Sequence, residues 1–307
     1  MHTKAKYIEG NEMELTDYLE GNDIKNNSIF HDLGYSDSTG NNILTFCDTI
    51  HYLNIAQSNP CISAVIVPEK LISYIKNKTI GIAISETPRD TFYKLYNNLR
   101  ENNLFPKLLN TGIEETSIIA DSAIVSKNSY IGKNTVISEN VVIKENVIIG
   151  DNCFIDVGCI IGNEGLLYFK DTDENNKFIK HSGIVEIGSN VTLLSSSIVV
   201  KSIFQNMPTK INDFSIIGIG TTIGHESSIG KNCIISGKCV IAKNVTIHDN
   251  SYLGTSVVIR ENLTLGISSN VKAGSVVIKS VKEHESVSGN FAINHNINLK
   301  NYFKSLK

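Results

Sequence analysis

The sequence lacks several features that would mark particular protein classes. Its six cysteines include no Cys-x-x-Cys pair, so neither a disulfide nor a metal site is favoured. It has no apolar run of membrane-spanning length and starts with the polar residues 1–4, so we expect a cytoplasmic protein without stable membrane insertion. The net charge is only −3 and lysines and glutamates are scattered, so no nucleic-acid partner is predicted.

What the sequence does have is an aliphatic residue at every sixth position. The period runs from Ile113 to Ile161 and again from Ile187 to Val277. Of the twenty-five such anchor positions, only Gln205 is not Ile, Leu or Val. A period of six fits neither an α-helix nor a flat strand, but it is typical of a hexapeptide parallel β-helix, in which three hexapeptides close a coil of about eighteen residues. The predicted fold class is therefore mainly β.

The residues between the anchors support this assignment. The fourth residue after an anchor is usually small or β-branched, and Cys153, Cys159, Cys233 and Cys239 occupy this slot, which predicts reduced thiols in the core. Gly or Asn near the corners, as in 131–134, suits sharp turns with positive φ. Because a single coil cannot bury its own face, about eight coils would stack into a column roughly 40 Å tall.

Residues 1–110 lack the six-residue period and are predicted to form a small α/β domain. The segments 62–67 and 79–85 are typical of short buried strands, and each precedes a helix-start signal, at Pro68 and at Pro88. Apolar residues follow Pro88 at helical spacing, which predicts one apolar helix face against the strands. Composition favours neither nucleotide recognition nor simple capping of the column.

The β-helix is expected over residues 111–290, followed by a helix at 291–307 with one apolar face. Between Ile161 and Ile187 the period shifts by two residues, so a loop is predicted at 162–186. Excursions from a solenoid tend to gather on its binding face, although a solvated connector is the alternative.

His225 is the candidate catalytic residue. It lies two places after an anchor, in an outward-facing slot, so it is not expected to pack in the β-helix core. Surface histidines without a task are common, but Glu226 is adjacent and Lys243 lies eighteen residues on, where its backbone N–H would stack over His225. A base beside an oriented amide is what acyl transfer requires.

The residues around His225 also resemble a known family. The stretch 209–230 resembles, without gaps, the catalytic coil of the UDP-3-O-acylglucosamine N-acyltransferases of lipid A synthesis, and His225 falls on that family's catalytic base. The segments 44–52 and 63–71 resemble its uridine-binding domain, in which aromatic residues at the positions of Phe46 and Tyr52 enclose the uracil. The resemblance implies a left-handed β-helix, a homotrimer and an active site between subunits.

The sequence departs from that family at Thr49, which stands in place of Asn, at Asn262, in place of a second His, and at Lys243, in place of Gly. The His225-Glu226 pair and the ending at 288–292 resemble instead the bacterial nucleotide-sugar N-acetyltransferases, which pair the catalytic His with a Glu and use acetyl-CoA.

Together the resemblances imply an N-acyltransferase that acts on a nucleotide-linked amino sugar, expected to be UDP-linked, for the synthesis of a bacterial surface glycan such as lipopolysaccharide. The expected donor is acetyl-CoA, with no metal. The implied residues are His225, Glu226 and the Lys243 backbone amide for catalysis, Phe46, Thr49, Tyr52 and His181 for substrate, and Thr255 and Ala273 for the CoA groove.

Several alternatives stay open. The donor could be an acyl-carrier-protein thioester, the acceptor a sugar hydroxyl, or the protein a non-catalytic scaffold that binds nucleotide sugars. Phe46 and Tyr52 could simply pack in a core. A β-helix carbonic anhydrase is disfavoured because it needs three metal-binding histidines, and only His225 and His248 lie within the regular coils.

Overall fold

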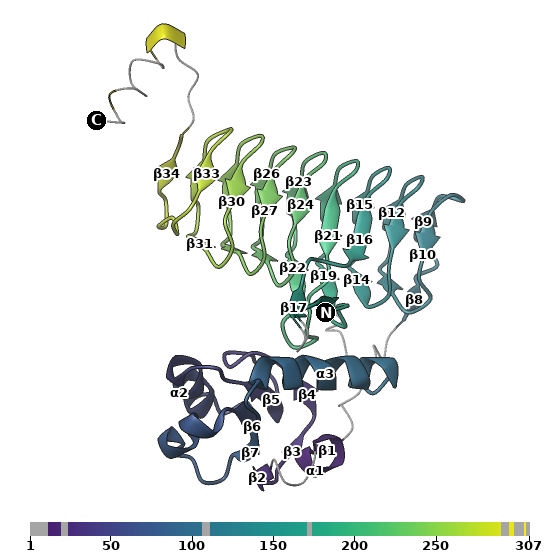
Figure 1. Ribbon diagram of the computed structural model, residues 1–307. Coiled ribbons are helices and arrows are strands. Elements are labelled where there is room, and N and C mark those ends of the chain that lie inside the picture. The colour runs from purple at the N-terminus through teal and green to yellow at the C-terminus, as the bar shows by residue number, and fades with distance from the viewer. Residues whose placement is uncertain are drawn as a thin grey trace.

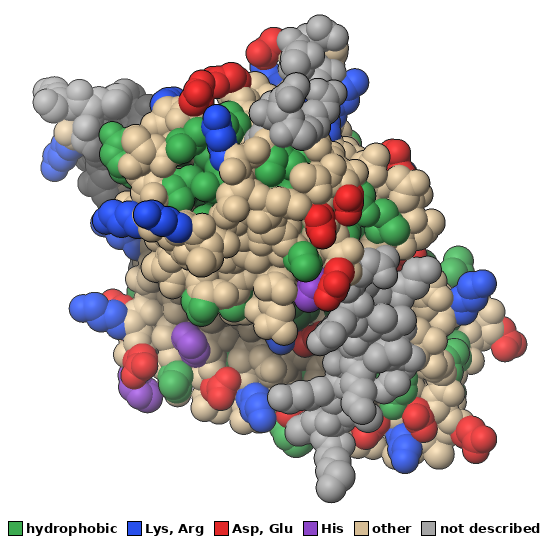
Figure 2. All heavy atoms as spheres, turned by 90° about the horizontal axis from the view of Figure 1, so that it is seen from below, with side chains coloured by type: hydrophobic (Ala, Val, Ile, Leu, Met, Phe, Trp, Pro, Cys, Tyr) green, Lys and Arg blue, Asp and Glu red, His purple; other side chains and the backbone are tan. Residues whose placement is uncertain are grey.

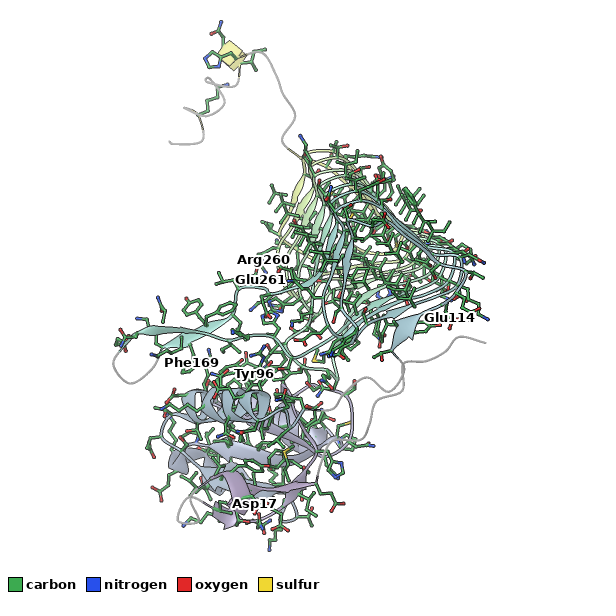
Figure 3. The ribbon with its side chains drawn as sticks, turned by 90° about the vertical axis from the view of Figure 1, so that its right-hand side faces the viewer. Asp17, Tyr96, Glu114, Phe169, Arg260 and Glu261 are labelled. Carbon is green, nitrogen blue, oxygen red and sulfur yellow. The ribbon has the colours of Figure 1, made fainter. Side chains whose placement is uncertain are left out.

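The computed structural model describes residues 12–19, 24–105, 111–170, 174–289, 295–297 and 304. It shows a left-handed parallel β-helix lying beside a small α/β domain, as Figure 1 illustrates. Seen nearly end-on in Figure 3, the column has a triangular outline. The predicted hexapeptide fold is therefore confirmed.

Three parallel sheets form the sides of the prism. Sheet I contains β8 (Gly112–Ile113), β11 (Tyr130–Ile131), β14 (Val147–Ile149), β19 (Val185–Ile187), β22 (Thr209–Ile211), β25 (Ser228–Ile229), β28 (Thr246–Ile247) and β31 (Thr264–Leu265). Sheet II contains β9 (Ile118–Ile119), β12 (Val136–Ile137), β15 (Phe154–Ile155), β20 (Thr192–Leu193), β23 (Ile216–Ile217), β26 (Ile234–Ile235), β29 (Tyr252–Leu253), β32 (Asn270–Val271) and β34 (Ser286–Val287). Sheet III contains β10 (Ile124–Val125), β13 (Val142–Ile143), β16 (Ile160–Asn163), β21 (Ile198–Val200), β24 (Thr222–Ile223), β27 (Val240–Ile241), β30 (Val258–Ile259) and β33 (Val276–Val277).

The six-residue period determines which side chains fill the prism. In the regular coils the anchor is the last residue of its strand and points inward, while the residue before it points outward. Cys153, Cys159, Cys233 and Cys239 are buried free thiols in the same core. At the corners, asparagines take up the predicted positive φ, for example 55° at Asn134. The inward-facing residues thus build a continuous apolar core.

Two coils are longer than eighteen residues. Ile149 pairs with Ile187, thirty-eight positions away, because the chain leaves the prism after β16 and forms the hairpin of β17 (Tyr168–Lys170) and β18 (Asn176–Phe178). Ile187 pairs with Ile211, twenty-four positions away, so six extra residues leave the prism after β21. The assignment of Gln205 to a coil position is therefore wrong: it lies in this second loop, 201–208, and an insertion of six does not disturb a period of six.

The N-terminal domain is built on a five-stranded sheet in the order β2 (Ile24–Asn26), β7 (Gly81–Ile84), β6 (Ile62–Val67), β5 (Ile43–Phe46) and β4 (Asp32–Leu33). A second pair consists of β1 (Met13–Glu14) and β3 (Ile29–Phe30). The helices are α1 (Leu15–Tyr18), α2 (Ile50–Ser58) and α3 (Pro88–Glu101). The helix expected after Pro68 is a 3₁₀ helix, Glu69–Tyr74. The apolar face of α3 packs on the sheet as the sequence predicts.

Both loops attach this domain to the column. Phe204, from the second loop, is buried against the rings of Tyr35, Phe92 and Tyr96 at centroid distances of 4.9, 5.9 and 5.7 Å. Phe169, from the hairpin, joins the same apolar cluster, and Figure 3 shows it near Tyr96 at the junction. The domain and the two loops of the column therefore share one hydrophobic cluster, which is separate from the core inside the prism.

On the face shown in Figure 2, acidic and basic side chains are interspersed. Within the described ranges, no helix is long and apolar enough to cross a membrane. The predicted C-terminal helix at 291–307 falls almost entirely outside the described residues, apart from a helical turn at 295–297 and residue 304.

Candidate functional site

The candidate site lies on one corner of the prism, where the chain passes from sheet III to sheet I. Successive coils place different groups there. After β16 comes the hairpin loop, after β21 the loop 201–208, after β24 the pair His225-Glu226, and after β27 the pair Lys243-Asn244. Strand pairing stacks these groups, since Ile161 pairs with Val199, Val199 with Ile223 and Ile223 with Ile241. Both excursions and the candidate catalytic pair therefore occupy neighbouring levels of a single corner.

His225 is held by its neighbour. Its Nδ1 lies 3.2 Å from Glu226 Oε2, and when the Glu226 carboxylate accepts this hydrogen bond, Nδ1 is the donor and Nε2 of the neutral ring has the free lone pair. Nε2 has no hydrogen-bond partner among the described residues. The side chain lies outside the β-helix core, as predicted, but it is only 5% exposed because the hairpin loop covers it.

Glu226 is fixed from several directions. Its Oε1 accepts a 3.0 Å hydrogen bond from the Ile203 backbone N–H, and its own N–H donates to Thr209 Oγ1 at 2.8 Å. Its backbone has φ of +61°, a conformation that Asn244 and Asn262 adopt at the same corner in the next coils. A glutamate is less suited to this conformation than asparagine, and such retained strain tends to accompany functional sites.

Behind His225 lies a second buried histidine. The His181 ring meets the His225 ring edge-on with centroids 5.1 Å apart, and its Nδ1 lies 2.9 Å from the Lys201 carbonyl oxygen. Burial lowers the pKa of His181, which favours the neutral ring. Because His181 is fully buried, it supports the His225 ring and is not placed to touch a substrate directly. A Cβ on Gly165 would lie 2.8 Å from His181 Cε1 and 2.9 Å from His225 Cδ2, so only glycine lets the loop cover both rings.

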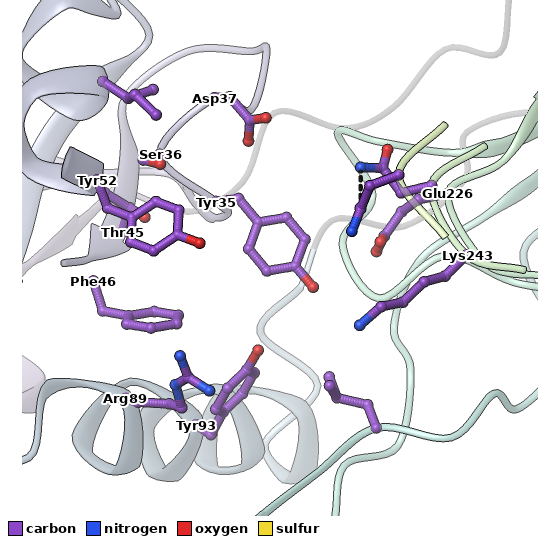
Figure 4. A pocket seen from close by; sticks show the side chains of 14 residues that line it. Tyr35, Ser36, Asp37, Thr45, Phe46, Tyr52, Arg89, Tyr93, Glu226 and Lys243 are labelled. Carbon is purple, nitrogen blue, oxygen red and sulfur yellow. Dashed lines mark hydrogen bonds between the residues drawn. The ribbon is translucent and has the colours of Figure 1, made fainter. Parts of the chain in front are cut away.

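A cavity of about 330 Å³, here called the junction cavity, separates this corner from the N-terminal domain. Figure 4 shows its two walls. The lining residues include Tyr35, Asp37, Thr45, Phe46, Tyr52, Arg89 and Tyr93 from the domain, and Glu226, Lys243, Asn244 and Asn262 from the column. Its volume is at the lower end of the range for small-molecule sites, about 300–1,000 Å³.

The domain side of the junction cavity is aromatic. Phe46 and Tyr52 lie one above the other with open space between them in Figure 4. Tyr52 is 47% exposed, so it is not a core residue, whereas Phe46 is half-buried and packs on Phe92. The Arg89 guanidinium lies 5.5 Å from the Phe46 ring centroid and donates to Asp48 at 3.0 and 3.3 Å. The alternative that both aromatic residues are ordinary core residues fails for Tyr52.

The structure thus brings some of the predicted residues together and separates others. Phe46, Tyr52, Glu226 and Lys243 line one cavity, with His225 directly behind Glu226. Thr49 is exposed at the start of α2, outside this lining. Thr255 and Ala273 stack as predicted, because β29 pairs with β32, but they lie at the corner between sheets II and III, away from His225.

Four groups of the candidate site were not predicted from the sequence. They are the side chains of Tyr35, Arg89 and Tyr93 and the backbone amide of Ile203. Burial raises the pKa of Tyr35, with the Glu226 carboxylate adding to the effect, and raises the pKa of Tyr93 to about 12, so both phenols stay protonated. The signal for the Ile203 loop was the single exception in the anchor series, Gln205.

In the described part of the chain, no cluster of three or more His, Cys, Asp or Glu side chains is arranged to hold a metal.

Comparison with known proteins yields structural neighbours only. No family model matches the chain, and no curated protein matches it. The fold is similar to UDP-N-acetylglucosamine acyltransferase from Campylobacter jejuni, with 20% identity, TM-score 0.47, and coverage of 64% of this chain and 84% of that one. It is also similar to LpxA from Acinetobacter baumannii, with 22% identity, TM-score 0.36, and coverage of 62% and 77%. A third neighbour is the acetyltransferase domain of PglB from Neisseria gonorrhoeae in complex with acetyl coenzyme A, with 15% identity, TM-score 0.24, and coverage of 83% and 99%. Identities this low bear on the fold alone.

Proposed function

We propose that this protein is an N-acyltransferase that moves an acetyl group from acetyl-CoA to the amine of a nucleotide-linked amino sugar, in the synthesis of a bacterial surface glycan. The observation that carries the proposal is that Glu226, which is hydrogen-bonded to the buried His225, lines one side of the junction cavity, while Phe46 and Tyr52, here called the aromatic slot, line the other. The proposal assigns His225 as the base and the aromatic slot as the place of the nucleobase.

The chemistry follows from the hydrogen bonds. The His225 Nε2 lone pair takes the proton that the amine loses as its nitrogen attacks the thioester carbonyl. Glu226 stabilises the imidazolium that forms, because its carboxylate is 3.2 Å from Nδ1 and its side chain is 3% exposed. A positioned base of this kind supplies about 10²–10⁴-fold in rate. The Lys243 backbone N–H, which has no acceptor in the described chain, would stabilise the oxyanion.

Phe46 and Tyr52 are proposed to bind the base of the nucleotide. Both rings line the junction cavity with open space between them in Figure 4, and the buried Thr45 hydroxyl of the same lining has no hydrogen-bond partner among the described residues. Aromatic faces give stacking area, and a hydroxyl with no partner can distinguish polar edges of a base. The nucleotide is expected to be uridine-based, with thymidine as the alternative.

A homotrimer is part of the proposal because two sides of the prism have rows of exposed apolar residues. Outward residues of sheets II and III are apolar in many coils, whereas those of sheet I from β19 onward are polar. The exposed rows include Ile118, Phe154, Ile216, Ile234 and Tyr252 on sheet II and Ile124, Val240, Val258 and Val276 on sheet III. Extended apolar patches of this kind mark protein interfaces. Thr255 and Ala273 lie between these two sides, so a CoA groove past them would meet a His225 from a neighbouring subunit.

The test is to incubate the protein with acetyl-CoA and a panel of UDP- and dTDP-amino sugars, and to detect products by mass spectrometry. The proposal expects one acceptor to gain a base-stable acetamide. An acyl-carrier-protein thioester used in preference to acetyl-CoA would indicate a longer acyl donor, and a base-labile ester would indicate O-acetylation.

Two further measurements, one on a variant and one on the wild-type protein, test nucleotide binding and catalysis separately. Phe46→Ala is expected to raise KM for the sugar nucleotide with little change in kcat, and an unchanged KM would argue against the aromatic slot. A wild-type protein that binds nucleotide sugars but turns over none of them with any thioester would favour the scaffold alternative.

A further inference from the structure

Lys243 contributes more than its backbone to the junction cavity. It lies one coil above His225 at the same corner, and Figure 4 shows its side chain reaching into the cavity toward Tyr35. Within the described chain, its ammonium makes no hydrogen bond or ion pair. The cation therefore faces the space between the aromatic slot and the catalytic pair without a protein partner.

The other charges that line the cavity are largely satisfied. Arg89 is bound to Asp48 and lies over the Phe46 ring. Both carboxylate oxygens of Glu226 are taken, one by Ile203 N–H and one by His225. Asp37 stands at the lining without a cationic partner among the described residues. An anionic ligand would thus meet two carboxylates, and Lys243 is the lining cation that no carboxylate of the described residues neutralises.

The order of groups along the cavity matches the order of groups in a nucleoside diphosphate sugar. The base would lie at Phe46 and Tyr52, and the sugar amine at His225, so the diphosphate bridge falls between them, where Lys243 points. Asn244 Nδ2 donates to Asn262 Oδ1 at 2.9 Å, which leaves the Asn262 amide hydrogens as neutral donors at the same corner, one coil further along. A flexible ammonium with three donors suits a phosphate whose position is set by other contacts.

We infer that the Lys243 side chain, which stands where the resembling family has glycine, binds the diphosphate of the acceptor. This inference rests on the proposed function, because it assumes that the aromatic slot takes the base. Lys243 then has two separable tasks, with its backbone amide at the reacting carbonyl and its ammonium on the diphosphate.

The test is isothermal titration of uridine, UMP and UDP into the full-length protein and into Lys243→Met, Lys243→Arg and Lys133→Met. Lys133 is an exposed lysine at another corner, outside the cavity, and serves as the matched control. We expect wild-type protein to bind UDP more tightly than uridine, and Lys243→Met to weaken UDP by about tenfold, as for loss of one partly exposed charge-assisted hydrogen bond. Uridine affinity should not change, Lys243→Arg should restore most of the UDP preference, and Lys133→Met should resemble wild type.

The possible outcomes distinguish the claim that Lys243 binds the diphosphate from the claim that the aromatic slot binds the base. A wild-type preference for UDP that Lys243→Met retains in full would overturn the role of this side chain but leave the nucleotide slot intact. Wild-type protein that binds neither uridine nor UDP would overturn the slot itself, and this inference with it. Equal loss of uridine and UDP affinity in Lys243→Met would show a general structural effect and would also count against the diphosphate contact.

Discussion

Replacing Glu226 by Gln changes one atom and should disable the base without unfolding the site. The carboxylate now accepts from Ile203 N–H at 3.0 Å and from His225 Nδ1 at 3.2 Å. A carboxamide has one oxygen, which must stay on the backbone N–H because that donor cannot turn away. The amide NH₂ then faces Nδ1, and the ring responds by accepting there and placing its proton on Nε2.

With its proton on Nε2, the His225 ring has no lone pair on the nitrogen that must accept the proton of the amine. We expect kcat for Glu226→Gln to fall by about 10²–10⁴-fold, as when a triad carboxylate becomes an amide. KM for the sugar nucleotide should change little, because the aromatic slot is untouched. The assay is thiol release from acetyl-CoA, with Glu139→Gln, an exposed glutamate on another corner, as the control. A kcat within about threefold of wild type would refute the tautomer argument.

Three other perturbations test the supporting structure. Phe204→Ala removes a ring that is 1% exposed and should lower the free energy of unfolding by about 3–5 kcal/mol in chemical denaturation; a loss below about 1 kcal/mol would contradict the shared hydrophobic cluster. Gly165→Ala should lower kcat while KM for the nucleotide is retained, because its Cβ meets both histidine rings, and Gly289→Ala, with open space around it, is the control. Burial raises the pKa of Asp32 to about 7, so its ionisation costs stability increasingly from pH 4 to 7. Asp32→Asn carries no such charge, and its Tm relative to wild type should rise between pH 5 and pH 8; a constant difference would argue against the raised pKa.

The fold was predictable because a six-residue period leaves little choice. Anchors such as Ile223 and small slots such as Cys239 must both point inward, and stacking in steps of eighteen follows from closure of the prism. The same regularity prevented the prediction of the loop 201–208 from the sequence. Its six extra residues kept every later anchor in phase, so only Gln205 broke the pattern.

The site was predictable only in part, because its pieces meet through tertiary contacts. His225 and Glu226 stand together in the sequence, so their pairing could be expected. The contact between His181 and His225 depends on how two loops of different length fold back over one corner. The junction cavity depends on how Tyr96 docks the N-terminal domain, with its hydroxyl 3.0 Å from the carbonyl oxygens of both Lys180 and Ile203. No local pattern encodes such long-range approaches.

The central claim is that His225 is the base that activates an amine. Its most direct test is the initial rate of acetyl transfer from acetyl-CoA to the best UDP-amino sugar. The rate is measured for wild-type protein and for His225→Ala, with the UDP-amino sugar at a concentration that occupies the same fraction of sites in both proteins. The account predicts that the rate falls by about 10²–10⁴-fold while UDP affinity is retained. Transfer by His225→Ala at the wild-type rate would contradict it.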